Sequence, residues 1–449
     1  MIPQTAAVLA FFLMLALSRR SGGAAVGVVI ASMMLWPEYL RIPMGLAAMS
    51  VPRLIAIALL IKFMGKGLHR KINFGKIDKL VLSLWIWSIL ATALAGADAP
   101  QQTEIIGKGF DTVLMYFVAR IAIRGPKDLP GLYVGLAISA VVLGIVGAIE
   151  TNTTQSPYSS MSGYTVWTSQ FEKGDEFRYG FLRAKGSTAT HIYFGMAMMV
   201  ILGMLWALRE YAGMKFFNLV SIPAAVIAAL SSMSSGPWLG CIELFVINSF
   251  VRRVSLIRPA LKLIVLAFVA MELLSNRHFY NLIDYIALDP ATAWYRTRLL
   301  EVAVSQWRDY WIVGVGSDWP HHWAALVDGR QHIDVVNHFL IVALSGGIPA
   351  AFMYISTHVI AVRMVINAWR DDSDNARRQL LFGMAATLVA LDISSMSVGL
   401  FGPVLLLSNI LLGATVSLAI AWKRNDDDQN MSSGFAPRIR KEGELAVLS

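Results

Sequence analysis

Histidines concentrate in two long polar segments of the chain. Six of the eight fall in or beside residues 151–188 and 276–334: His191, His278, His321, His322, His332 and His338. Imidazole is the side chain that most readily exchanges a proton near neutral pH. A single histidine is usually structural, but this concentration indicates acid–base chemistry in the two segments.

The longer segment is also rich in arginine and tryptophan, and it contains no lysine. Its arginines are Arg277, Arg296, Arg298, Arg308 and Arg330. Its tryptophans are Trp294, Trp307, Trp311, Trp319 and Trp323. The planar guanidinium binds phosphate through two parallel hydrogen bonds, which lysine cannot do. The segment therefore suits a phosphorylated, sugar-bearing lipid. The alternative is an aromatic belt with interfacial helices.

The sequence lacks motifs for metal- or nucleotide-dependent chemistry. His321 and His322 near Asp318 come closest to a metal-ligand set. Adjacent histidines point apart on a helix, however, and no carboxylate–histidine spacing recurs. There is no Walker loop, GxSxG or HExxH motif, and no DxD or DxE motif stands at the start of an outer loop. We therefore expect no metal and no cofactor, and ATPase, hydrolase and zinc-protease activities lack support.

Charged residues inside the apolar stretches are few. They are Lys108, Asp111, Glu243, Glu272 and Asp392. Lys108 and Asp111 lie three residues apart on one helix and are expected to neutralise each other. Because buried charges must be paired, we expect the others to form structural pairs or the floor of a cavity near the outer surface.

The composition identifies the kind of molecule that must position these groups. Of 449 residues, 56% are hydrophobic and only 15% are charged, against roughly 25% charged in an ordinary soluble chain. The mean hydropathy is +0.58. These values exclude a soluble Rossmann or TIM-barrel enzyme, a nucleic-acid-binding domain and a disordered scaffold. The net charge of +9 is a topology signal, because the basic residues occur in short runs between apolar segments. The single cysteine, Cys241, excludes an intramolecular disulfide.

The apolar runs predict an all-α polytopic membrane protein with about 12–13 transmembrane helices. They lie near 5–18, 23–37, 53–65, 80–97, 104–119, 130–150, 189–208, 217–233, 237–250, 261–275, 335–361, 379–396 and 403–422. Basic residues fall in alternate connections, which we therefore expect to be cytoplasmic.

This orientation gives a domain plan. N-terminal helices occupy 1–150, a first periplasmic loop 151–188 and central helices 189–275. A large periplasmic loop spans 276–334, C-terminal helices 335–422, and a disordered cytoplasmic tail 423–449.

Three stretches in or beside these segments combine glycine with arginine or histidine. The first is Arg183-Ala-Lys-Gly186-Ser-Thr-Ala-Thr-His191, with Gly195 after it. The second is Arg298-Leu-Leu-Glu-Val-Ala-Val, followed by Gly314-Val-Gly316. The third is Asp334-Val-Val-Asn337-His338-Phe-Leu340, followed by Gly346-Gly347-Ile-Pro349. Together, over roughly 180–355, they resemble the O-antigen ligase and Wzy-type polysaccharide polymerase superfamily.

The resemblance implies a metal-independent glycosyltransferase of the GT-C type in the bacterial inner membrane. The donor would be a glycan on undecaprenyl diphosphate at the periplasmic face. The acceptor would be a second lipid-linked glycan, for a polymerase, or lipid A–core, for a ligase. Arg183, Arg298 and, in reserve, Arg296 would bind the diphosphate.

The same resemblance assigns the proton chemistry. His338 would accept the proton of the acceptor hydroxyl, with His191 as substitute or partner. Asp334 would orient the His338 ring, unless it only caps the helix, and Asn337 would bind a sugar hydroxyl or the diphosphate.

Two departures from the family pattern favour a polymerase. The stretch Ser234-Ser235-Gly236-Pro237-Trp238 lacks the arginine that the family often has after a middle helix. At the third stretch, Asn337 precedes His338, whereas the family often has histidine first. Two other functions stay open: a lipid-linked-sugar flippase or transporter, and a non-catalytic scaffold for envelope assembly. A transporter would need polar groups at mid-membrane depth and broken helices in both halves.

Overall fold

The computed structural model describes residues 2–17, 19, 21–37, 40–44, 47–68, 72–159, 177–213, 215–253, 257–274, 290–315, 321–327 and 333–434. The first half holds α1 (Ile2–Leu17), α2 (Gly22–Leu35), α3 (Val51–Gly65), α4 (Lys76–Leu94), α5 (Ala99–Ala122) and α6 (Leu129–Thr153). The middle holds α7 (His191–Leu208), α8 (Lys215–Ser231), α9 (Ser235–Ser249) and α10 (Ile257–Leu274). The last part holds α12 (Pro290–Ser305), α13 (His321–Val327), α14 (His338–Asp371), α15 (Asn375–Ser395) and α16 (Gly402–Gly434).

Short elements complete the described chain. Strands β1 (Arg41–Met44) and β2 (Ala47–Ser50) form one antiparallel hairpin. Strands β3 (Phe177–Arg178) and β4 (Phe181–Leu182) form another. Single 3-10 turns are η2 (Pro126–Asp128), η5 (Arg209–Tyr211), η6 (Phe250–Arg252) and η9 (Trp307–Asp309).

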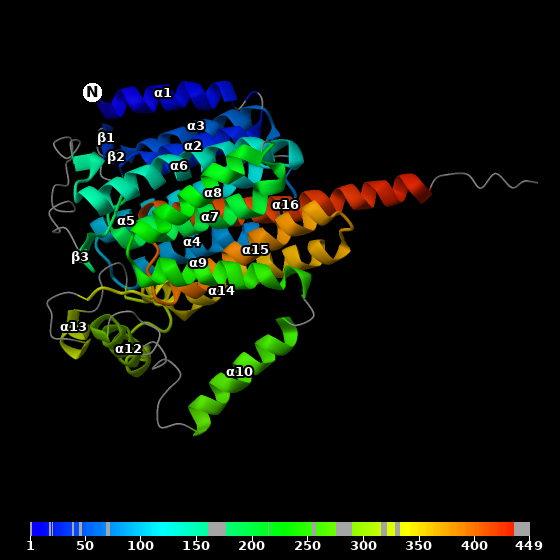
Figure 1. Ribbon diagram of the computed structural model, residues 1–449. Coiled ribbons are helices and arrows are strands. Elements are labelled where there is room, and N and C mark those ends of the chain that lie inside the picture. The colour runs from blue at the N-terminus through cyan, green and yellow to red at the C-terminus, as the bar shows by residue number, and fades with distance from the viewer. Residues whose placement is uncertain are drawn as a thin grey trace, which may run out of the picture.

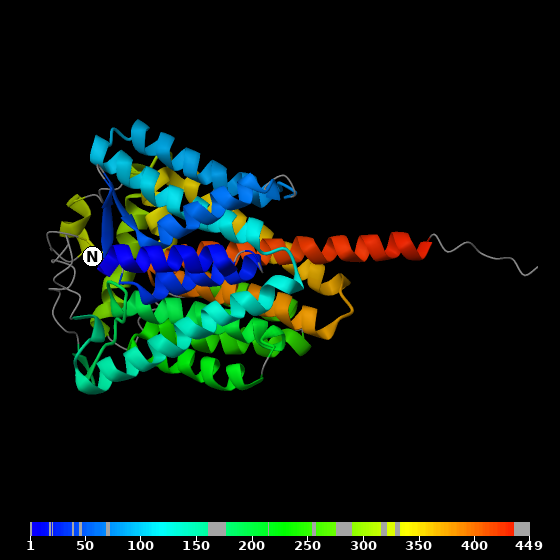
Figure 2. The same ribbon diagram turned by 90° about the horizontal axis from the view of Figure 1, so that it is seen from above.

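The long helices run side by side in a bundle with two distinct ends (Figures 1 and 2). We call the end that carries both β-hairpins, α12 and α13 the hairpin end. The opposite end, where the last turns of α16 extend beyond the bundle, is the tail end. Because consecutive helices alternate in direction, the connections α1–α2, α3–α4, α5–α6, α7–α8 and α14–α15 all lie at the tail end.

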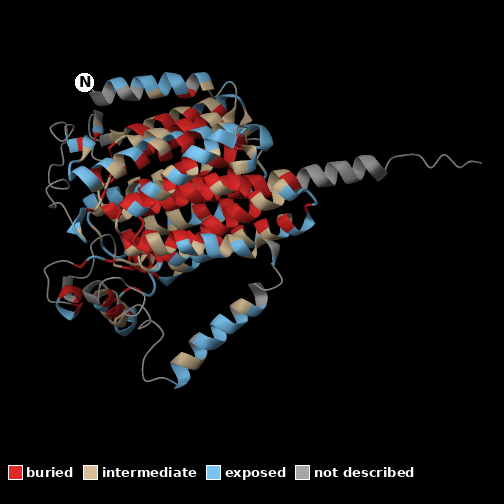
Figure 3. Ribbon diagram, viewed as in Figure 1, coloured by how far each residue is buried: buried red, intermediate tan, exposed pale blue. Residues whose placement is uncertain are grey.

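Helix α7 is the centre of the bundle. It packs against α6, α8, α9, α15 and α16, and 83% of its apolar stretch is buried, against 22% in α4. Figure 3 shows the buried residues running through the middle helices, with exposed residues on α10 and α1. A helix that is apolar on every side must be surrounded by other apolar surfaces. The start of α7 is therefore held rigidly at the hairpin end.

The predicted all-α membrane fold is confirmed. Among the described residues, five helices are long and apolar enough to span a membrane: Lys76–Leu94, Pro126–Thr153, His191–Tyr211, His338–Asp371 and Gly402–Trp422. Shorter apolar helices cover Gly22–Leu35 and Lys215–Ser231. The predicted first loop, 151–188, contains the β3–β4 hairpin, and the predicted large loop, 276–334, contains α12 and α13. Helix α16 continues through Gly434, into the tail that the sequence predicted to be disordered.

Capping residues define where the helices near the hairpin end begin. The Thr190 hydroxyl accepts a hydrogen bond from the backbone N–H of Tyr193 at 3.3 Å, at the start of α7. The Asn337 side-chain oxygen accepts one from Leu340 N–H at 3.0 Å, at the start of α14. Each bond satisfies one of the N–H groups that a helix start leaves unpaired. His191 and His338 thus occupy the same place, the first residue of a helix.

Candidate active site

The start of α7 and the turn between α8 and α9 face each other at the hairpin end. Arg183, just after β4, donates a hydrogen bond from Nη2 to Ser234 Oγ at 3.0 Å. Arg178 in β3 donates from Nη1 to the carbonyl of Met233 at 3.0 Å. The backbone N–H of Ala184 binds the carbonyl of Ser231, also at 3.0 Å. The hairpin is therefore fastened onto the α8–α9 turn by both side chains and backbone.

Three cations surround His191. Arg183, Arg178 and Lys185 all lie close enough to act electrostatically on its ring. The imidazole is 8% exposed and Ser234 is 2% exposed. Such a cluster of positive charge binds a polyanion. The cations disfavour a protonated imidazole, and a bound polyanion offsets this repulsion. We call Arg178, Arg183, Lys185, His191 and Ser234 the His191 cluster.

One carboxylate organises the loop that carries these cations. Glu150, near the end of α6, accepts hydrogen bonds from the backbone N–H groups of Lys185 and Gly186 at 2.8 and 2.9 Å. Its other oxygen accepts one from the Ser156 hydroxyl. Glu150 is 1% exposed. Glu150 therefore fixes the backbone of the loop at Lys185 and Gly186, between Arg183 and His191.

The two glycines of the first motif have definite structural roles. Gly186 has φ +53°, and a Cβ there would lie 2.7 Å from the Phe194 ring. A Cβ on Gly195 would lie 2.4 Å from Ser232 Oγ and 2.6 Å from Pro237 Cγ. The first position needs the left-handed conformation that glycine adopts freely. The second needs close approach between α7 and the α8–α9 turn. Both glycines keep the His191 cluster compact.

Part of this cluster was not predicted from the sequence. Arg183 and His191 were candidates, but Arg178, Lys185 and Ser234 were not. The available signal was local: three cations occur between residues 178 and 185, directly before His191. The middle motif lacks an arginine in the sequence, but Arg183 binds its Ser234 in space, and Arg178 binds the carbonyl of Met233 directly before it.

His338 lies in a different environment. It is 4% exposed, and its Nδ1 accepts a hydrogen bond from the backbone N–H of Leu400 at 3.3 Å. A neutral imidazole with an acceptor at Nδ1 carries its proton on Nε2. In this arrangement His338 can donate a hydrogen bond from Nε2. Its other ring nitrogen, Nδ1, would have to accept a proton, but it already accepts a hydrogen bond from the N–H of Leu400.

The two neighbours that the sequence assigned to His338, Asp334 and Asn337, make hydrogen bonds of their own. The backbone of Asp334 exchanges hydrogen bonds with the Tyr295 hydroxyl, at 2.8 Å from N–H and 3.0 Å to the carbonyl. Asp334 does not provide the cap of α14. Asn337 is the cap, through its side-chain oxygen, so its amide nitrogen is the end of the side chain that is left to bind a ligand.

Arg298 belongs to a small cluster formed by the large loop. Its Nε donates to the carbonyl of Leu326 in α13 at 3.0 Å, and its Nη1 pairs with Glu301 at 2.9 Å. Arg296 lies two residues earlier on the same helix. Trp323 and Leu344 are fully buried in this cluster. The hydrogen bonds of Arg298 to described residues therefore join α12 to α13, and none joins it to the His191 cluster. A shared phosphate site for Arg183 and Arg298 stays a prediction.

Helix α14 is interrupted at Gly346 and Gly347. Gly347 has φ 76° and ψ 177°, which is not helical. The freed backbone groups are bound by the large loop: Val315 N–H donates to Leu344 O at 2.7 Å, and Ile348 N–H to Trp311 O at 3.0 Å. Trp87 Nε1 donates to Gly346 O at 2.6 Å. Residues just before Gly316 in the second motif thus form hydrogen bonds with the backbone on both sides of the break. Backbone groups outside a regular helix require such partners in a membrane protein.

One series of contacting polar side chains was also not predicted from the sequence. It runs from His338 to Asp392. His338 contacts Tyr354 edge to face, at 5.2 Å between ring centroids, and Tyr354 contacts His358 at 4.5 Å. His358 Nδ1 lies 3.2 Å from Asp392 Oδ1. The sequence treated His358 as an isolated helix residue and left Asp392 without a named partner. Helices α14 and α15 bring them together, because the two residues lie on facing sides of an antiparallel pair.

The other intramembrane charges find partners different from those expected. Asp111 pairs with Arg53 on α3, and Lys108 pairs with Glu104 one turn earlier. The expected Lys108–Asp111 pair is therefore wrong: the structure offers each a better placed partner. Glu243 accepts a hydrogen bond from Ser394 Oγ at 3.2 Å.

None of the other histidine side chains of the large loop is among the described residues. His278 and His332 lie outside the described residues, as do the side chains of His321 and His322. Within the described part of the chain, no three His, Cys, Asp or Glu residues lie together in a group that could hold a metal ion.

Comparison with known proteins adds no family. No protein-family model matches the chain, and no curated protein matches it. The resemblance to the polymerase and ligase superfamily therefore rests on the three motifs themselves.

Proposed function

We propose that this protein is a membrane glycosyltransferase that moves a glycan from undecaprenyl diphosphate to an acceptor hydroxyl, and that it is a Wzy-type polysaccharide polymerase. The observation that carries the proposal is the His191 cluster. Three cations, a histidine and a serine hydroxyl meet at one end of the bundle. A diphosphate leaving group requires positive charge, and an attacking hydroxyl requires a proton acceptor.

The reaction assigns a role to each group. The acceptor oxygen attacks the anomeric carbon of the donor sugar, and the bond from that carbon to the diphosphate oxygen breaks. Undecaprenyl diphosphate leaves with the bonding electrons, and Arg183, Arg178 and Lys185 stabilise its charge. The proton of the acceptor hydroxyl passes to His191. His338 donates a hydrogen bond from Nε2, and the Asn337 amide nitrogen binds a sugar hydroxyl.

Proton acceptance moves from His338 to His191 because of the Leu400 contact. With Nδ1 bound to a backbone N–H at 3.3 Å, His338 would have to break that bond to accept a proton there. His191, at the start of α7, adjoins the cations that would hold the donor. In this scheme Arg296 and Arg298 form a second group of arginines, which belongs to the large loop.

We further propose the arrangement in the membrane: about 12–13 spans, a GT-C-type architecture and a periplasmic hairpin end. Basic residues of the tail-end connections support this orientation, among them Lys66, Arg124, Lys127 and Arg209. Tags at Gly163 and Gly329, both outside the described residues, should be accessible from outside intact spheroplasts. Protection of both would reverse the orientation.

The decisive test is transfer by the purified protein. Given a glycan on undecaprenyl diphosphate and an acceptor glycan, with no nucleotide and no divalent cation, it should release undecaprenyl diphosphate and lengthen the acceptor. The Arg183→Ala variant serves as the matched negative control. The proposal would be contradicted if no transfer occurred to the acceptor glycan and none occurred to lipid A–core.

A deletion strain separates polymerase from ligase. Loss of long polymer, with single repeats left on the lipid, indicates a polymerase. Long polymer that accumulates on the carrier without attachment to lipid A–core indicates a ligase.

One observation favours a second candidate, a flippase for a lipid-linked sugar. The break of α14 at Gly346–Gly347 is of the kind that transporters use at substrate sites. The break lies next to the large loop at the hairpin end, however, and its backbone groups are bound by residues 311–315. Movement of a fluorescent lipid diphosphate across proteoliposomes, without glycan transfer, would support the flippase.

A further inference from the structure

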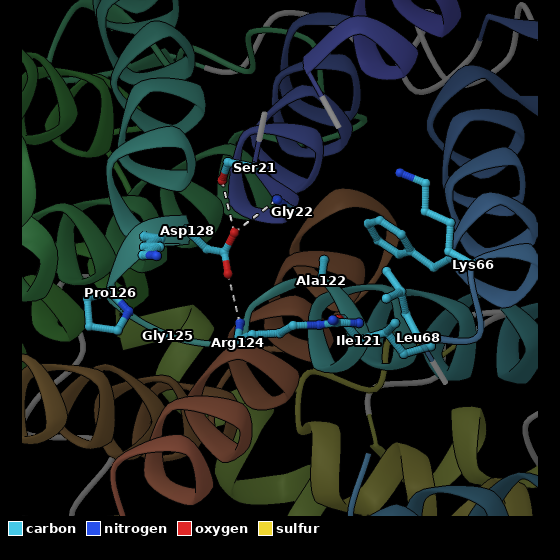
Figure 4. A pocket seen from close by; sticks show the side chains of 12 residues that line it. Ser21, Gly22, Lys66, Leu68, Ile121, Ala122, Arg124, Gly125, Pro126 and Asp128 are labelled. Atoms are coloured by element: carbon cyan, nitrogen blue, oxygen red, sulfur yellow. Dashed lines mark hydrogen bonds between the residues drawn. The ribbon is translucent and has the colours of Figure 1, made fainter. Parts of the chain in front are cut away.

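A pocket of about 460 Å³ opens at the tail end, away from the His191 cluster. The α1–α2 connection, the end of α3 and the α5–α6 connection form its walls (Figure 4). Its lining combines two kinds of surface. Phe63, Leu68, Ile121 and Ala122 are apolar, whereas Lys66, Arg124 and Lys127 are cationic.

The one carboxylate in the lining, Asp128, is already engaged. Its Oδ1 accepts hydrogen bonds from Ser21 Oγ at 3.0 Å and from the N–H groups of Gly22 and Gly23 at 2.9 and 3.3 Å. Its Oδ2 accepts one from Arg124 N–H at 3.0 Å. Figure 4 shows the contacts of Asp128 with Ser21, Gly22 and Arg124 on one side of the pocket and Lys66 on the other. Asp128 thus caps the start of α2, and its charge is shared among four donors.

The cations of the pocket are not neutralised in the same way. Among the described residues, no carboxylate lies within ion-pair distance of Lys66 or Lys127. Burial lowers the pKa of Arg124, and Asp128 offsets this only in part. Beyond the pocket, Lys66 and Arg19 both act electrostatically on Lys62. The region therefore has an excess of positive charge next to an apolar wall.

We propose that this pocket binds the phosphate-bearing headgroup of an anionic phospholipid. Lys66, Lys127 and Arg124 contact the phosphate, and Phe63, Leu68 and Ile121 contact the upper part of the acyl chains. A basic pocket between helix ends, on the side where basic residues gather, is the arrangement that recognises such headgroups. Phe63 and Ile121 are largely buried and Leu68 is half-buried, so the pocket offers apolar surface directly beside its cations. A lipid can cover both kinds of surface, whereas a free phosphate covers only the charged one.

Lipid titration of the purified protein tests the site. The protein is reconstituted in phosphatidylcholine with increasing phosphatidylglycerol, and thermal unfolding and retained lipid by native mass spectrometry are followed. The wild type should be stabilised by phosphatidylglycerol and should retain it. One basic side chain near an anionic surface is worth about fivefold in affinity, so Lys66→Gln/Lys127→Gln should need roughly 30-fold more phosphatidylglycerol for the same effect.

The matched control is Lys76→Gln/Lys79→Gln, which removes two exposed lysines at the same end but outside the pocket. It should respond like the wild type. Inorganic phosphate in pure phosphatidylcholine is a third arm: an equal response to phosphate would replace the lipid by a free anion as the ligand. An equal response of both double variants, or no difference between the two lipids in the wild type, would overturn the site.

Discussion

His191 and His338 each begin a helix at the hairpin end, yet their surroundings give them opposite properties. Three cations act electrostatically on His191, and Glu150 binds the backbone of the loop that carries Lys185. His338 is bound by Leu400 N–H and leads through Tyr354 to the His358–Asp392 pair. The first group concentrates positive charge at one place, whereas the second joins a histidine to a carboxylate. Position in the sequence alone would rank them equally.

The largest effect is expected at His191. Replacement by Ala should lower transfer by roughly 10²- to 10⁴-fold, the usual contribution of a proton acceptor, while the protein still inserts and binds the lipid-linked donor. His191→Gln keeps a hydrogen-bonding group and separates proton transfer from hydrogen bonding. Initial rates with purified variants are the measurement. Full activity of both variants across pH 6 to 9 would return proton acceptance to His338.

Arg183 tests the anion side of the same cluster. Loss of a donor to developing negative charge costs roughly 10²- to 10³-fold in turnover. Arg183→Ala should show such a loss, and Arg183→Lys should recover only part of it because lysine lacks the planar fork. Arg308→Ala, which removes an exposed arginine in the large loop, is the control and should retain activity. Equal activity of Arg183→Ala and Arg308→Ala would remove Arg183 from the site.

His338 should matter for stability more than for chemistry. His338→Ala leaves the N–H of Leu400 without its acceptor, at a cost of about 1–3 kcal/mol in the free energy of unfolding. His338→Gln offers an amide oxygen in place of Nδ1 and should restore part of the loss. Thermal unfolding in detergent reports stability, and transfer per folded molecule reports chemistry. A loss of transfer by 10² or more at unchanged stability would make His338 the proton acceptor.

Arg298 should show the smallest effect. Lysine at this position keeps the charge and can still bind Glu301, so Arg298→Lys should lose only the second bond to Leu326. We expect transfer to change by less than about tenfold, together with a slight loss of stability. A loss equal to that of Arg183→Ala, with donor binding impaired in both, would instead place the two arginines in one phosphate site.

Composition alone determined the class of molecule. An apolar content of 56% with 15% charge excludes an ordinary soluble fold. The long continuous apolar runs then indicate helices, which satisfy their own backbone hydrogen bonds in lipid. The alternation of basic connections also followed from the sequence, because charge distribution between apolar runs needs no tertiary information. Arg183 and His191 could be found for a related reason, since they lie eight residues apart and remain close after folding.

The tertiary structure alone decided which polar groups meet. Arg183 binds Ser234 across 51 residues, and His338 binds Leu400 across 62. Asp111 pairs with Arg53 and not with nearby Lys108, because the packing of α3 on α5 brings the arginine closer. A sequence shows how many residues separate two groups, but helix direction, crossing and breaks determine their separation in space. That is why the same residue type, at the first position of two helices, becomes the proposed proton acceptor in one place and a buried hydrogen-bond acceptor for a backbone N–H in the other.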